Sequence, residues 1–341
     1  MAKTLITVPV EIRQVIFKQL FASTIVYIGF DDSDNETGST DGTSSTDESG
    51  SLDDTNSTKE PSSANTSILL TCRQISIEAK SVLASNISIH IWSTKAMISF
   101  LSTLRPEVIQ SIRYIRLLQS FPLPLYTHVH RNSFTTFHVG EAFCMFPGLQ
   151  LDLLEVEDCY HAAGCYDAGG ILSSLGTYMA IDSLIQINGW KELHFITPTT
   201  QFMSEGVQYL CERSAQPEKW NGVVLDRDGT DSAACVKMFI AKEPDVAGLS
   251  ENPETRIDYN ATPGFLFDRW GDEFVDVVDV QRYLENREVL LVAKRGVGAS
   301  YVQNGKQLHK DIKSLLDRMN WGDILADNRY LDPEDNPENF L

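Results

Sequence analysis

The sequence predicts a mixed α/β protein in which strands alternate with helices. Short β-branched or alternating segments, typical of strands, recur between longer segments with apolar residues at helical spacing. The composition, with 42% hydrophobic and 22% charged residues over 341 positions, supplies enough apolar surface for a buried core. The same composition excludes a collagen-like, coiled-coil or wholly disordered chain.

The opening segment, residues 8–21, is expected to form an amphipathic helix. Its apolar residues recur at the spacing that places them on one side of a helix. A proline in the first turn costs nothing, because the N–H group there would be unpaired anyway. A short helix cannot bury such a stripe alone, so it must pack on the helix expected around residues 72–83 or on a partner protein. The candidate partner-contact residues are Val8, Pro9, Ile12, Val15, Ile16 and Leu20.

The remaining elements follow from the same two patterns. Further strands are expected at 24–30, 87–92, 112–118, 149–156, 192–197, 236–241 and 288–293. Further helices are expected at 68–83, 93–104, 170–187, 201–213 and 306–319. This alternation indicates a mixed or partly parallel sheet covered by helices.

The domain organisation is marked by one segment of unusual composition. Residues 31–66 carry ten acids and one base and are rich in Ser, Thr, Gly and Asn, so we expect disorder there. The segment is either a phosphorylatable acidic tether or a tolerated loop insertion, and the low entropic cost of long loops favours the insertion. We expect an N-terminal region at 1–118, an α/β region at 119–326 and an acidic tail at 327–341.

Charge and hydropathy exclude several classes of protein. The net charge is −19, of which −9 lies in residues 31–66 and −10 in the rest, so binding to nucleic acid is disfavoured. No run of about 18 apolar residues is present, and the N-terminus lacks the apolar core of a signal peptide. The six cysteines form no C-x-x-C pair. We expect an intracellular protein, cytoplasmic or nuclear, with reduced thiols and no membrane contact.

Two segments together carry a family resemblance. The first, residues 6–17, reads ITVPVEIRQVIF, and the second, residues 68–79 followed by 81–91, contains LLTCRQ and EA. Over residues 5–118 the chain resembles fungal F-box-like proteins. The resemblance implies a small helical F-box-like unit that docks to the adaptor subunit of a cullin-RING ubiquitin ligase through the candidate residues of the opening helix. The C-terminal region would then hold a substrate.

Two groups of residues are candidates for metal binding. His128 and His130, two apart, would share a face if extended, with His138 nearby. Cys159 and Cys165 flank His161, which would provide the beginning of a zinc site. Neither group supplies four evident ligands at zinc-site spacing, so surface histidines and unliganded loop cysteines are favoured.

Two loops carry weaker signals. Residues 294–300 contain the glycines of a phosphate-binding loop but no Walker sequence, so a strand–turn–strand connection is favoured. Residues 226–231 are acid-rich like a calcium loop, but Lys237 stands where the closing glutamate belongs.

The sequence as a whole therefore favours a non-enzymatic protein-interaction module with no cofactor. The interpretation as a substrate receptor of a ubiquitin ligase stands beside two alternatives. One is a scaffolding protein whose opening helix stays buried. The other is a metal-dependent hydrolase that uses His128, His130 or Cys159. No pattern in the sequence specifies an oligomeric state.

Overall fold

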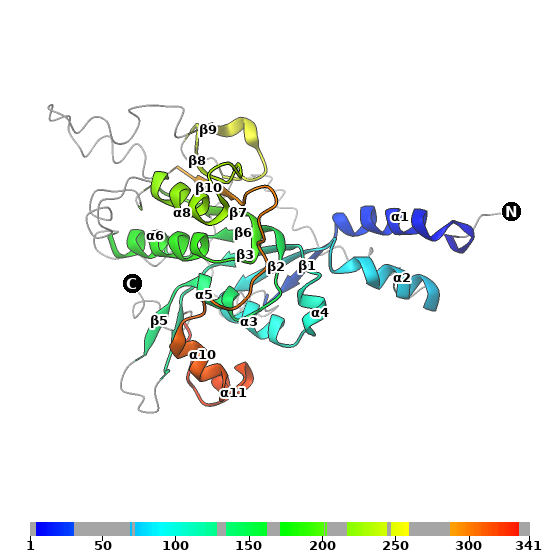
Figure 1. Cartoon of the computed structure of the whole chain (residues 1–341), viewed down its shortest axis with the longest axis horizontal. Helices are drawn as coiled ribbons and strands as arrows, with labels where there is room; N and C mark the ends of the chain where they lie inside the picture. Colours follow the sequence, from blue (N-terminus) through cyan, green and yellow to red (C-terminus); the bar gives the residue numbers. More distant parts are fainter. Residues whose placement is uncertain are drawn as a thin grey trace, which may run out of the picture.

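The computed structural model confirms a mixed α/β fold with a single large sheet (Figure 1). The structure describes residues 5–30, 69, 72–127, 134–161, 171–200, 202, 217–243, 247–258 and 287–333. The acidic segment 31–66, the pair His128 and His130, Cys165, most of the helix expected at 201–213 and the end of the tail from 334 lie outside these residues.

The main sheet has eight strands in the order β1-β2-β3-β6-β7-β10-β8-β9. The first five run parallel, β10 is antiparallel to both of its neighbours, and β9 is antiparallel to β8. The strands are β1 (Ile25–Ile28), β2 (Ser88–Ser93), β3 (Tyr114–Gln119), β6 (Leu151–Glu157), β7 (Trp190–Thr197), β8 (Cys235–Ala241), β9 (Arg256–Asp258) and β10 (Val289–Lys294). A separate antiparallel pair consists of β4 (Leu123–Leu125) and β5 (Thr135–Phe137).

Helices alternate with the strands along the chain. They are α1 (Val10–Ala22), α2 (Arg73–Leu83), α3 (Thr94–Ser102), α4 (Pro106–Ile109), α5 (Val139–Cys144), α6 (Ile171–Gln186), α8 (Glu218–Asp228), α10 (Lys310–Leu316) and α11 (Trp321–Ala326), with short 3-10 turns η1 (Leu5–Thr7) and η5 (Pro253–Thr255). Buried side chains of α3, α5, α6 and α8 join one hydrophobic core with the inward side chains of the strands. The boundary expected near residue 118 falls inside β3, and strands from both sides of it share the sheet.

The alternation along the strands separates the two faces of this sheet. In β2, Ile89 and Ile91 are buried in the main core, whereas Ser88 and His90 point to the other face and stay half-buried. Near β8 and β10 that second face carries a small apolar cluster of its own, around Leu249 of the loop before β9. Between β2 and β7 the same face is polar. This is unusual, because parallel strands are generally apolar on both faces.

The last expected helix, 306–319, is shorter in the structure. Residues 305–308 form turns, and α10 begins at Lys310 after His309, whose side chain accepts a hydrogen bond from the Asp311 N–H. A second short helix, α11, starts after Asn320, where a capping box with Asp323 satisfies two backbone N–H groups. The expected helix is therefore shortened at both ends, to Lys310–Leu316, and α11 follows outside its predicted bounds.

In the residues that the structure describes, no helix combines the length and the apolar character needed to cross a lipid bilayer.

Candidate functional site

The opening helix and its neighbour form an arm that projects from the sheet. Figure 1 shows α1 and α2 side by side at the end of the molecule that carries the N-terminus. Phe17 and Phe21 of α1 are completely buried, and Ile75 and Ala79 of α2 belong to the same hydrophobic core. The two helices therefore hold each other through aromatic and aliphatic side chains. We call α1 and α2 together the arm.

A partly buried ion pair fixes the arm. Arg13 donates two hydrogen bonds to the Glu78 carboxylate, with Nε–Oε2 at 2.7 Å and Nη2–Oε1 at 2.6 Å. Its Nη1 also donates to the backbone carbonyls of Ile6 and Val8. The hydrogen bond between the two side chains lowers the pKa of Glu78 and raises the pKa of Arg13. The guanidinium thus ties the chain before α1 to the side of α2.

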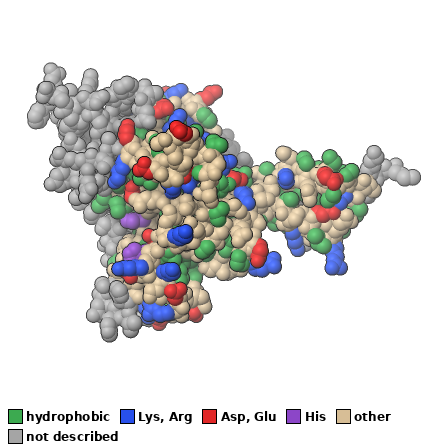
Figure 2. Space-filling view, in the orientation of Figure 1, with side chains coloured by type: hydrophobic (Ala, Val, Ile, Leu, Met, Phe, Trp, Pro, Cys, Tyr) green, Lys and Arg blue, Asp and Glu red, His purple; other side chains and the backbone are tan. Residues whose placement is uncertain are grey.

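The opposite side of α1 is apolar and exposed. Ile12 is 52% exposed, Val15 56% and Ile16 41%, and helical spacing places these three on one side. We call them the outer strip; Figure 2 shows hydrophobic side chains along the visible surface of the arm. The predicted stripe also included Leu20, but Leu20 is half-buried against the core. The interpretation of one stripe was therefore wrong in part, because α1 has two apolar faces and the phenylalanines occupy the inner one.

The two remaining candidate residues precede the helix. Pro9 is exposed and is the residue immediately before α1, so it lies one position earlier than the first turn in which we expected it. Val8 is half-buried, and its carbonyl accepts a hydrogen bond from Arg13. The structure thus brings only the outer strip together as an exposed surface.

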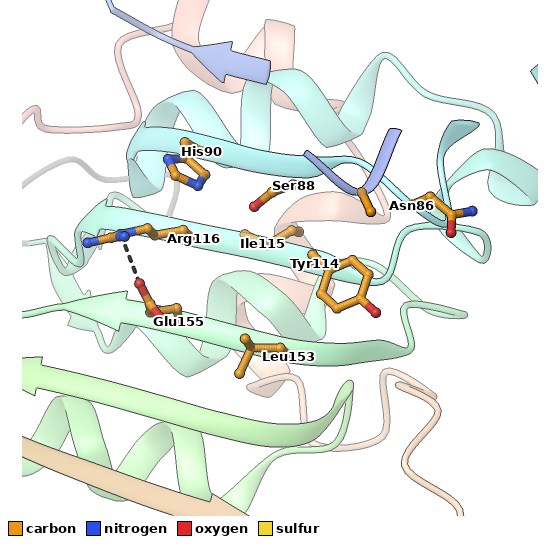
Figure 3. Close-up of a pocket in the computed structure, with 9 residues that line it drawn as sticks. Asn86, Ser88, His90, Tyr114, Ile115, Arg116, Leu153 and Glu155 are labelled. Carbon is orange, nitrogen blue, oxygen red and sulfur yellow. Dashed lines mark ion pairs between the residues drawn. The ribbon is translucent and has the colours of Figure 1, made fainter. Parts of the chain in front are cut away.

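A second site lies on the polar face of the sheet, next to the base of the arm. It is a cavity of about 360 Å³ that Ala22, the last residue of α1, helps to line. Its other principal side chains come in pairs from three adjacent strands, Ser88 and His90, Tyr114 and Arg116, and Leu153 and Glu155. Figure 3 shows them on one face of the sheet. We call this cavity the sheet pocket.

Register explains why these side chains meet. Residues paired across the parallel strands form one row over the sheet, in the order Tyr27, His90, Arg116, Glu155 and His194. Paired residues on neighbouring strands point to the same face and lie within side-chain reach. Arg116 and Glu155, a base and an acid, are therefore neighbours near the centre of the row.

Arg116 is surrounded by carboxylates. Its Nε lies 2.9 Å from Glu155 Oε1, its Nη2 lies 2.7 Å from Glu157 Oε1, and its Nη1 lies 3.7 Å from Glu251 Oε1. Burial alone would lower the pKa of Arg116, but the three carboxylates raise it above its ordinary value. The guanidinium is therefore charged, and its own charge is more than balanced.

Burial shifts the pKa of both residues that flank Arg116 in the row, His90 and Glu155. Burial, reinforced by the positive charge of Arg116, lowers the pKa of His90 to about 4, so His90 is neutral at physiological pH. Burial raises the pKa of Glu155, although Arg116 and His194 act in the opposite sense. His194 in turn lies 2.8 Å from Glu192 through Nε2.

The described members of the two candidate metal groups, His138, Cys159 and His161, form no metal site, and His128, His130 and Cys165 lie outside the described residues. Across the described ranges, no three His, Cys, Asp or Glu side chains are grouped closely enough to hold a metal ion. His161 instead lies 2.8 Å from Asp158 through Nδ1, and Asp158 also accepts hydrogen bonds from Thr177 and Thr197, both at 2.7 Å. Cys159 is buried beside this network. These contacts are those of a buried polar network at the end of β6.

The two loops with weaker signals prove to be joined to each other. Asp228, from the segment that resembles a calcium loop, accepts hydrogen bonds from Arg295 at 2.7 and 2.6 Å and from the Gly296 N–H at 2.7 Å. Both side chains are almost fully buried. The glycine-containing loop after β10 therefore serves to bind an internal carboxylate. No strand forms at Tyr301, in contrast to the strand–turn–strand connection that we expected.

Comparisons with known proteins add one finding. Residues 2–142 match a family model described as a domain of unknown function (DUF7730), which spans the arm, the first three strands of the main sheet and the start of α5. No curated protein matches the chain. No solved structure matches it either.

Proposed function

We propose that this chain is a non-enzymatic protein-interaction module whose outer strip binds a partner protein. The observation that carries the proposal is the exposure of Ile12, Val15 and Ile16 on a helix whose opposite side already holds it in place through Phe17 and Phe21. Adjacent exposed aliphatic side chains are typical of interaction sites. The strip is therefore available to a second polypeptide without any unfolding of the arm.

The partner that we propose is the adaptor subunit of a cullin-RING ubiquitin ligase. This assignment is supported by the resemblance of residues 8–13 and 71–79 to fungal F-box-like proteins. An exposed aliphatic strip on a helix suits binding in an apolar groove, with the strip as the central contact and charged residues at its rim. In this function the sheet region holds a substrate, and the chain acts as a substrate receptor.

The test is a direct binding measurement between the purified full-length chain and the purified adaptor subunit, by isothermal titration calorimetry. We expect Ile12→Asp and Val15→Asp each to weaken binding by about tenfold or more, because central apolar contacts carry most of the energy of an interface. Lys18→Asp introduces the same side chain at an exposed position of α1 outside the strip and is the matched control.

Near-ultraviolet circular dichroism checks that each variant keeps its fold. A wild-type chain that is folded and yet fails to bind the adaptor would contradict the ligase function and leave a scaffolding protein. Equal loss of binding in Lys18→Asp and Ile12→Asp would show that the strip is not the contact surface.

A further inference from the structure

The sheet pocket combines an apolar wall with an aromatic rim. Ala22 and Leu153 contribute aliphatic surface, and Tyr114, which lines the same cavity, is 37% exposed. A lysine or arginine side chain suits such a pocket, because its methylene stem packs on apolar surface while its charged head stays in polar surroundings. A cation beside an exposed aromatic ring gains further attraction from the ring's electrons.

The charge of the pocket favours a cation. Arg116 and Glu155 line the pocket, and two further carboxylates, those of Glu157 and Glu251, contact Arg116 from outside the lining, so the group as a whole has a formal net charge of −2. His90 adds no positive charge at neutral pH, because its pKa is lowered to about 4. An anionic ligand would meet this excess of negative charge, and an uncharged one would leave it uncompensated.

One carboxylate oxygen in the pocket lacks a donor. Glu155 Oε1 is bound to Arg116 at 2.9 Å, whereas Oε2 lies 3.9 Å from His194 Nδ1, which is too long for a hydrogen bond. Within the part of the chain that the structure describes, no other donor reaches it. A cationic N–H group entering the pocket would find an acceptor here that is already oriented by the Arg116 contact.

The occupant must come from another protein. The long segment 31–66 carries a net charge of −9 and the whole chain −19, so neither this segment nor a second copy complements the pocket. We propose that the sheet pocket binds a lysine or arginine side chain of a basic segment in a partner protein. This inference rests on the proposed function in one respect, which is that the chain binds another protein as a substrate. It adds the chemical class of the substrate segment that the pocket accepts.

The test uses fluorescein-labelled glycine peptides that differ only in their central residues, which are lysine, arginine, glutamine or glutamate. Binding to the full chain is followed by fluorescence polarisation at low and moderate salt. We expect the lysine and arginine peptides to bind at least tenfold more tightly than the glutamine peptide, and the glutamate peptide not to bind. Equal binding of all four peptides, or of none, overturns the proposal.

Variants locate the binding. Glu155→Gln removes the negative charge and one of the two acceptor oxygens while Glu157 still holds Arg116, and Ser88→Leu fills the cavity from β2. Both variants are expected to weaken the binding of the basic peptides about tenfold. Glu107→Gln, at an exposed acid on α4, should have little effect and is the matched control. Equal losses for Glu155→Gln and Glu107→Gln would reveal diffuse attraction to an acidic surface and refute a specific pocket.

The two proposals fail separately. Glu155→Gln should keep full affinity for the adaptor, and Ile12→Asp should keep full affinity for the lysine peptide, because the outer strip and the sheet pocket share no residue. If the chain binds the adaptor but does not bind the basic peptides, only the proposal about the sheet pocket is wrong. Thermal unfolding of each variant separates a lost contact from a lost fold.

Discussion

Replacing Asp158 by alanine is expected to cause a large loss of stability. The Asp158 side chain is fully buried and accepts four hydrogen bonds, from the Tyr160 N–H at 3.0 Å, His161 Nδ1 at 2.8 Å and the hydroxyls of Thr177 and Thr197 at 2.7 Å. These donors come from the end of β6, from α6 and from β7. One carboxylate therefore links a helix to two adjacent strands.

The size of the loss follows from what alanine leaves behind. Each hydrogen bond to a charged group is worth about 1.5–3 kcal/mol, but two of the donors are hydroxyls that rotate toward other acceptors. The Tyr160 backbone N–H cannot do so and remains unpaired in the core, and His161 Nδ1 is left with only the Thr177 hydroxyl, 3.2 Å away. We therefore expect a loss of about 3–5 kcal/mol for Asp158→Ala. Asp158→Asn keeps one carbonyl oxygen and should lose about 1–3 kcal/mol.

Urea unfolding followed by tryptophan fluorescence and circular dichroism measures these losses. Asp231→Ala, at an exposed acid outside the network, is the control and should change the free energy of unfolding by less than about 0.5 kcal/mol. A loss below about 1 kcal/mol for Asp158→Ala, equal to that of the control, would refute the reasoning that the network links the three elements.

Three further results are expected. His90 should titrate at about pH 4 in an NMR experiment, because burial and Arg116 disfavour its charged form, and a pKa near 6.5 would contradict the described packing. Burial alone would raise the pKa of Asp228, but hydrogen bonds from Arg295 lower it. The stabilisation by this carboxylate is therefore complete above its unfolded pKa of about 4, and it is lost as the pH falls through the lower pKa of the folded state. The stability difference between wild type and Asp228→Asn should therefore shrink in acid, and an unchanged difference at low pH would disprove this. Gly176→Ala places a methyl carbon 2.5 Å from the Tyr160 ring and should cost about 1–3 kcal/mol, whereas Gly222→Ala, with open space around it, should stabilise α8 by about 0.5–1 kcal/mol; similar melting temperatures for the two variants would contradict the packing argument.

Most of the strands could be predicted from the sequence. The segment expected at 87–92 corresponds to β2 at Ser88–Ser93, and the segment at 236–241 corresponds to β8 at Cys235–Ala241. The agreement has a physical basis, because β-branched residues at alternate positions suit a half-buried pleated surface. The prediction of a mixed sheet covered by helices is confirmed on the same basis.

The inner face of α1 could not be identified by spacing alone. Ile12, Val15 and Ile16 satisfy helical periodicity, but so do Phe17 and Phe21, which are four residues apart. The aromatic side chains bury more surface, so the side of α1 that carries them packs toward α2. The ion pair between Arg13 and Glu78 could not be predicted from the sequence either, because the two residues are 65 positions apart in the chain.

The sheet pocket was missed because it depends on strand order. Arg116 and Glu155 are far apart in the sequence, and only the pairing of β3 with β6 brings them together. One signal was present, since Ser88 and His90 alternate with isoleucines and so had to point away from the core. Without knowledge of which strands are neighbours, this signal identified a polar face and no cavity.

The division of α1 into two independent sides has an evolutionary consequence. Phe17 and Phe21 hold this helix through fully buried side chains, so the half-exposed residues of the outer strip are less constrained by the stability of the domain. Under the proposed function, substitutions there would change the choice of binding partner while the architecture is retained. Homologues with the same anchors and divergent surface aliphatics would accordingly share a fold and differ in whom they recognise.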